Sequence, residues 1–144
     1  MSDRQPDHHD AEIVLKLYDL RREAVMRESR NAMAAKFWPM NYEDFLAVTK
    51  NDHPLNAAFR QVSTYWEMAY GFARHGIVNA DFLIENTTEG LFLYAKVQPF
   101  LERYRKEAGP LAFRNAEWIS TQCDEGRQRF DMILQRVQRI LETK

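Results

Sequence analysis

The sequence has very few of the residues that form disulfides or tight turns. Cys123 is the single cysteine, and only five glycines and five prolines occur among 144 residues. A lone thiol cannot form an intrachain disulfide or a cysteine-based zinc site, which fits a reducing compartment. A β-sandwich or barrel needs many tight turns, so the low glycine and proline count disfavours both. We therefore expect a helical protein located in the cytoplasm.

Long apolar runs and a surplus of basic charge are also missing. No run of about 18 apolar residues occurs, which excludes a membrane-spanning helix, and the polar N-terminus has no apolar signal core. The 20 Lys and Arg residues are balanced by 21 Asp and Glu residues, which leaves a net charge of −1. Nucleic-acid-binding domains carry a basic surface, so we expect no nucleic-acid partner and no membrane span in this chain.

No motif of a common enzyme or cofactor site is present. The chain lacks the glycine-rich G-x-G-x-x-G and P-loop patterns, the G-x-S-x-G motif and the HExxH zinc motif. The Glu-x-x-His pairs of a di-iron bundle are absent too. His8 and His9 are metal-ligand types, but adjacent histidines point in different directions. We therefore expect no metal site, no cofactor and no catalytic residue.

Apolar residues recur at spacings of three and four along most of the chain, which predicts amphipathic helices. The clearest stripe lies in the helix expected over residues 54–75: Leu55, Phe59, Val62, Trp66, Ala69 and Ala73. Further long helices are expected over residues 10–36, with Asp10 as N-cap, over residues 88–107, and in the last stretch up to residue 144, as one helix or two. Short helices are expected over residues 41–50 and 80–85.

These patterns predict an all-α fold, a helical bundle of about four long helices plus two short ones. Residues 1–9 are polar and have nothing to bury, so we expect a flexible N-terminal tail there. Residues 10–144 then form a single helical domain, which is close to the commonest domain size of about 100–150 residues.

Glu67 is the most interesting polar residue of the apolar stripes. It lies beside Trp66, and Gly71, one turn later, allows a neighbouring helix to come close. Glu67 then either forms a structural ion pair with an arginine, stays solvated, or faces a ligand. In the last case the ligand-binding residues of an interhelical pocket would be Trp66, Glu67, Tyr70 and Tyr94, and a raised Glu67 pKa would support it.

Residues 62–107 read VSTYWEMAYGFARHGIVNADFLIENTTEGLFLYAKVQPFLERYRKE. The stretch resembles a group of uncharacterised bacterial helical domains, in which an aromatic-rich helix bearing a Glu ends at a Gly. A short acidic helix and a helix running into a PF-E-YR pattern follow in that group. The resemblance implies an all-helical fold and a bacterial origin, but no activity and no site residue. Some of those domains follow a membrane helix, whereas this chain has a polar tail there.

The absence of catalytic motifs and the long amphipathic stripes favour a non-catalytic helical interaction or regulatory module. Its partner would be another protein or a second copy of the chain, with residues 126–144 offering their apolar stripe for a homo-oligomer. One alternative is a small-ligand-binding or enzymatic helical domain with a pocket near Glu67. A second, less favoured alternative is a nucleic-acid-binding protein.

Overall fold

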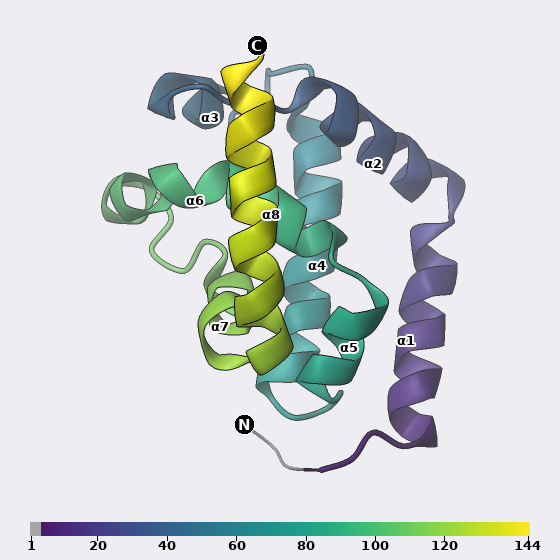
Figure 1. Ribbon diagram of the computed structural model, residues 1–144. Helices are drawn as coiled ribbons and strands as arrows, with labels where there is room; N and C mark the ends of the chain where they lie inside the picture. Colours follow the sequence, from purple (N-terminus) through teal and green to yellow (C-terminus); the bar gives the residue numbers. More distant parts are fainter. Residues whose placement is uncertain (1–3) are drawn as a thin grey trace.

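The computed structural model describes residues 4–144, and in this range the chain is all helical, without strands (Figure 1). The prediction of an all-α helical bundle is therefore confirmed. The described chain has eight helices: α1 (His8–Arg21), α2 (Ala24–Lys36), α3 (Tyr42–Val48), α4 (Asn56–Arg74), α5 (Ala80–Asn86), α6 (Glu89–Glu107), α7 (Arg114–Gln122) and α8 (Asp124–Glu142). None of them is long and apolar enough to cross a membrane.

Helix α4 lies at the centre of the bundle and packs against α2, α5, α6 and α7. Helix α8 covers α6 and α7, and its buried residues Phe130, Ile133 and Val137 join the core. Helix α1 differs from the others, because it runs along the outer side of the bundle and packs mainly on α5 and α2 (Figure 1). The apolar stripe of α8 thus faces the inside of the molecule, while α1 is the peripheral helix.

The first helix begins before residue 10 and ends well before residue 36, the two limits that the sequence predicts for it. Asp7, and not Asp10, is the N-cap of α1: its carboxylate accepts hydrogen bonds from the amides of His9 and Asp10. The helix expected over residues 10–36 is two helices, because Glu23 caps a new start by accepting from the Met26 amide at 2.9 Å. Helix α1 therefore begins at His8, within the segment that the sequence analysis assigns to the tail. Residues 1–3 lie outside the described range, and the flexibility of the tail and the single-domain assignment stay predictions.

The last stretch consists of two helices that meet at Cys123. Gly126, in the first turn of α8, is the reason they can pack so closely. A β-carbon at this position would lie 2.0 Å from the carbonyl oxygen of Ile119 in α7. The glycine therefore marks a close approach of two helices.

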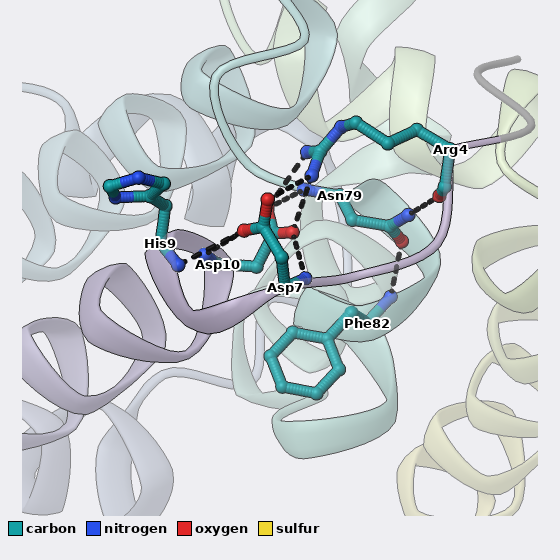
Figure 2. Close-up of polar contacts among 6 residues, drawn as sticks. All are labelled: Arg4, Asp7, His9, Asp10, Asn79 and Phe82. Atoms are coloured by element: carbon teal, nitrogen blue, oxygen red, sulfur yellow. Dashed lines mark hydrogen bonds and ion pairs between the residues drawn. The ribbon is translucent and has the colours of Figure 1, made fainter.

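Hydrogen bonds of the Asp10 side chain hold the start of α1 against the start of α5 (Figure 2). Its carboxylate is fully buried and accepts hydrogen bonds from the Arg4 guanidinium at 2.6 and 2.8 Å and from the amides of Asp7 and Asn79 at 2.8 Å each. The Asn79 side chain donates to the Arg4 carbonyl and accepts from the amide of Phe82. The hydrogen bond with Arg4 holds the pKa of Asp10 far below its ordinary value. This network positions the N-terminal end of α1 beside α5.

Candidate functional site

Glu67 binds the beginning of α7. Its carboxylate oxygens accept hydrogen bonds from the backbone amides of Asn115 at 3.0 Å and Ala116 at 2.8 Å. Burial raises the Glu67 pKa, although these two hydrogen bonds oppose the rise. Gly71 allows the approach, because the Asn115 side chain packs directly over it. The partner of Glu67 is thus a helix N-terminus and not an arginine side chain, and the rise in its pKa comes from burial at this contact between helices.

The four predicted ligand-binding residues do not line one common hollow. A shallow cavity of about 220 Å³ includes Glu67, but neither Trp66, Tyr70 nor Tyr94 lines it. Tyr70 is fully buried and packs against Trp66, with ring centroids 5.8 Å apart, while Tyr94 packs against Phe130. Ligand binding by these four residues stays a prediction, and other residues form the larger hollows.

A larger concave surface lies where α2, α6 and α8 meet, and we call it the cationic pocket. It has a volume of about 550 Å³ and is walled in part by Trp38 and Phe92. Its charged lining residues are Arg21, Arg30, Glu89, Lys96 and Arg136. Four cations and one carboxylate give these residues a formal charge of +3, although the net charge of the whole chain is −1.

Lys96 is the most unusual residue of the cationic pocket. It lies in the middle of α6 and is 7% exposed. Its ammonium is 3.4 Å from the carbonyl oxygen of Met33 and 3.9 Å from the centroid of the Trp38 ring. Among residues 4–144, no carboxylate pairs with it. Burial, with a smaller contribution from the nearby Lys144, lowers the Lys96 pKa from 10.5 to about 8.

Two of the other three cations of the pocket, Arg21 and Arg30, share a single carboxylate. Arg30 binds Glu89 through its Nε and Nη2 atoms at 2.6–2.8 Å, and Arg21 approaches the same carboxylate at 3.5 Å. The indole of Trp66 also donates to Glu89, at 3.3 Å. Arg136 lies over the ring of Phe92, 5.7 Å from its centroid. Because one carboxylate balances only one of these charges, the pocket retains an excess of positive charge.

The first turn of α6 adds to this positive potential. Thr87, Thr88 and Glu89 line the cationic pocket, so the N-terminus of α6 opens onto it. The side chain of Thr88, the N-cap residue, makes no capping hydrogen bond. A helix N-terminus carries a partial positive charge and free backbone N–H groups, both of which favour an anion nearby.

A second hollow, which we call the apolar groove, separates α1 from α4 and α5. Its volume is about 260 Å³, and its apolar and aromatic lining residues are Val14, Leu15, Leu17, Tyr18, Tyr65, Trp66 and Leu83. The remaining lining residues, Arg21, Asn86 and Thr87, also line the cationic pocket. The two hollows are therefore neighbours that meet at three polar residues.

One feature of the sequence indicates the cationic pocket. Lys96 stands between Ala95 and Val97 in the most apolar part of residues 90–97, where a charged side chain has little access to water. No local sequence pattern indicates the pairing of Arg30 with Glu89, because 59 residues separate them. As to metals, residues 4–144 contain no cluster of three or more His, Cys, Asp and Glu side chains suited to hold an ion.

Comparison with known proteins identifies a family. A family model described as a domain of unknown function (DUF4760) matches residues 6–123. The match extends well beyond residues 62–107, where the resemblance to uncharacterised helical domains lies, and the predicted bacterial origin stays a prediction. No curated protein and no solved structure matches the chain. Helix α8, which supplies Arg136 to the cationic pocket, follows the matched region.

Proposed function

The chain belongs to the DUF4760 family, for which no activity is known, and from the geometry of its own pocket we propose that it is a non-catalytic domain that binds a small anionic molecule. The observation that carries the proposal is Lys96, a buried ammonium without a carboxylate partner at the wall of a cationic pocket. Strongly perturbed titratable groups in concave sites are typical of functional sites.

A bound anion would offset a cost that the free protein carries. Removing an ammonium from water is unfavourable unless an opposite charge or several hydrogen bonds replace the lost hydration. Among the described residues, the Met33 carbonyl at 3.4 Å and the rings of Trp38 and Phe37 take this role for Lys96. A carboxylate or phosphate group near Lys96 would supply the missing partner, and Arg30 and Arg136 would add to the attraction.

The size of the site favours a small molecule. A volume of about 550 Å³ falls within the usual range of about 300–1,000 Å³ for ligand pockets. Nucleic acids require contacts to many phosphates along an extended surface. Four cations gathered in one concavity fit a compact anion better.

The test is a titration of the protein with butyrate and with inorganic phosphate. Binding is monitored through the NMR chemical shifts of the Lys96 and Trp38 side chains. We expect at least one of the two anions to bind, and Lys96→Met to weaken that binding at least about tenfold, because a charge-assisted contact is lost. Lys50→Met serves as the matched control, since Lys50 is exposed and lies in the segment that connects α3 and α4. Equal affinity of wild type and Lys96→Met would refute the proposal.

The interaction module remains a second candidate, supported by apolar side chains that α1 and α2 leave in solvent. Leu15 is 66% exposed, Val25 58% and Tyr18 52%. The stripe of α8, in contrast, is largely used inside the bundle. Self-association through α1 and α2 would appear as a concentration-dependent mass in analytical ultracentrifugation that Val25→Gln abolishes. A constant monomer mass would count against it.

A further inference from the structure

We infer that the anion is the head of a single-chain amphiphile, a molecule with a carboxylate or phosphate at one end and one alkyl chain. Its head would bind at Lys96 in the cationic pocket, and its chain would lie in the apolar groove under α1. This inference rests on the proposed function and adds the class of ligand. It draws on the fact that the two hollows share Arg21, Asn86 and Thr87.

The walls of the two neighbouring hollows differ in polarity. Apart from the tyrosine hydroxyls and the Trp66 indole N–H, the polar members of the groove lining are the three residues that it shares with the cationic pocket. Away from this junction the groove wall is aliphatic or aromatic, and beyond the junction the cations of the pocket begin. A ligand that complements both sections needs a charged end and an apolar end.

Two of the three aromatic residues of the groove, Tyr65 and Trp66, present mainly carbon surface, because their polar atoms bind elsewhere. The Tyr65 hydroxyl donates to the carbonyl oxygen of Leu17, and the Trp66 indole donates to Glu89. The centroid of the Tyr18 ring lies 5.3 Å from the Cζ atom of the Arg21 guanidinium. An alkyl chain in the groove would therefore leave the polar atoms of Tyr65 and Trp66 with their partners.

The groove suits a chain better than a protein segment. Its volume of about 260 Å³ is small, and a helix with side chains has a diameter of about 10–12 Å. Leu15 and Tyr18 at its edge are 66% and 52% exposed, so they are apolar surface that a bound chain would cover. The hydrophobic effect then favours each methylene that enters the groove.

The experiment compares ligands that differ in one property each, all below their micelle-forming concentrations, by isothermal titration calorimetry. Decanoate is the probe, butyrate has the same head with a short chain, and decyltrimethylammonium has a cationic head on an alkyl chain about one carbon longer. Decyl phosphate distinguishes a phosphate from a carboxylate head. We expect decanoate or decyl phosphate to bind at least about tenfold more tightly than butyrate, because several methylenes are buried, and at least about tenfold more tightly than the cationic probe.

Two sets of variants test separately how the alkyl chain of the ligand and its charged head contribute to affinity. The double variant Leu15→Gln/Tyr18→Gln should weaken binding of decanoate at least about threefold relative to butyrate, whereas Leu111→Gln, an equally exposed leucine outside both hollows, should leave the ratio unchanged. Lys96→Met should weaken binding of every anion. Circular dichroism of each variant checks that it is folded.

The possible results distinguish the two proposals. If decanoate binds no more tightly than butyrate, or if the double variant leaves their ratio unchanged, the amphiphile inference is overturned, and loss of anion binding in Lys96→Met still supports the proposed function. If the cationic probe binds as well as decanoate, or if no anion responds to Lys96→Met, both proposals fail. Binding of decanoate together with undetectable binding of butyrate supports the inference.

Discussion

Replacing Lys96 by methionine should make the free protein more stable. The pKa of Lys96 is lowered from 10.5 to about 8, which corresponds to about 3 kcal/mol of unfolding free energy that the buried charge costs at neutral pH. Methionine has a similar length and no charge, but it loses the cation–π contact with Trp38, worth about 0.5–2 kcal/mol. The carbonyl of Met33 keeps its hydrogen bond from the Phe37 amide, so no acceptor is left unpaired. We expect a net gain of about 1–2 kcal/mol at pH 7.

The pH dependence of this gain gives a second, independent check. A lysine whose folded-state pKa is lowered binds its proton less tightly in the folded than in the unfolded protein. Between pH 8 and 10.5 the unfolded state therefore carries more protons, and the contribution of Lys96 to stability rises with pH. The advantage of Lys96→Met should be greatest below pH 8 and should shrink as the pH rises to 10.5. Buried tyrosines, such as Tyr65 with a pKa raised to about 12, act in the opposite direction but equally in both proteins.

Urea unfolding followed by circular dichroism at several pH values between 7 and 10.5 measures the difference. Lys50→Met, an exposed site, should change stability by less than about 0.5 kcal/mol at every pH. The reasoning about Lys96 would be refuted if Lys96→Met destabilised the protein at pH 7, or if its effect did not vary with pH. Either result would mean that the lysine is well solvated or already paired in the free protein.

Three other substitutions test the contacts that hold the helices together, each by urea unfolding. Asp10→Asn should cost about 2–3 kcal/mol at pH 7, since an amide cannot accept from all of the donors around it; because the folded pKa of Asp10 is lowered, this loss should shrink as the pH falls below about 4. Gly126→Ala should destabilise by at least about 1–3 kcal/mol in spite of the better helix propensity of alanine, because the β-carbon meets the backbone of Ile119; an unchanged stability would show that α7 and α8 lie further apart. Glu67→Gln should cost about 1–2 kcal/mol through a weaker cap on α7, and a loss of anion affinity in this variant would instead restore Glu67 as a ligand residue.

Much of the fold follows from local sequence signals. The periodicity predicts α4 and α6 closely, and the caps are of the usual residue types: Asn41 and Asn79 cap α3 and α5, and Gly76 follows α4 with a positive φ. The break between α1 and α2 is harder to predict, because neither glycine nor proline marks it. It depends on Glu23, which accepts from the backbone amide of Met26 and so starts a new helix within an uninterrupted run of good helix formers.

The candidate site is harder to predict than the fold because its contacts join distant parts of the chain. The sequence marks Glu67 as a polar residue of the helix interface, but its partners are backbone amides of α7, which no residue type in the sequence identifies. The cationic pocket brings together Arg21, Arg30, Lys96 and Arg136 from four helices. Their charges are balanced by acids elsewhere in the chain, so the net charge conceals a local excess.

This local excess is difficult to explain by folding alone. The bundle could place an apolar side chain at Lys96, where the neighbouring Ala95 and Val97 are buried, and it would gain stability by doing so. Arg30 and Arg21 compete for one carboxylate, and Arg136 adds a further cation at the same concavity. The buried charge of Lys96 costs free energy in the free protein, and a single bound anion would offset that cost and interact with the neighbouring arginines as well. A site arranged to bind that anion therefore explains this group of cations more simply than folding does.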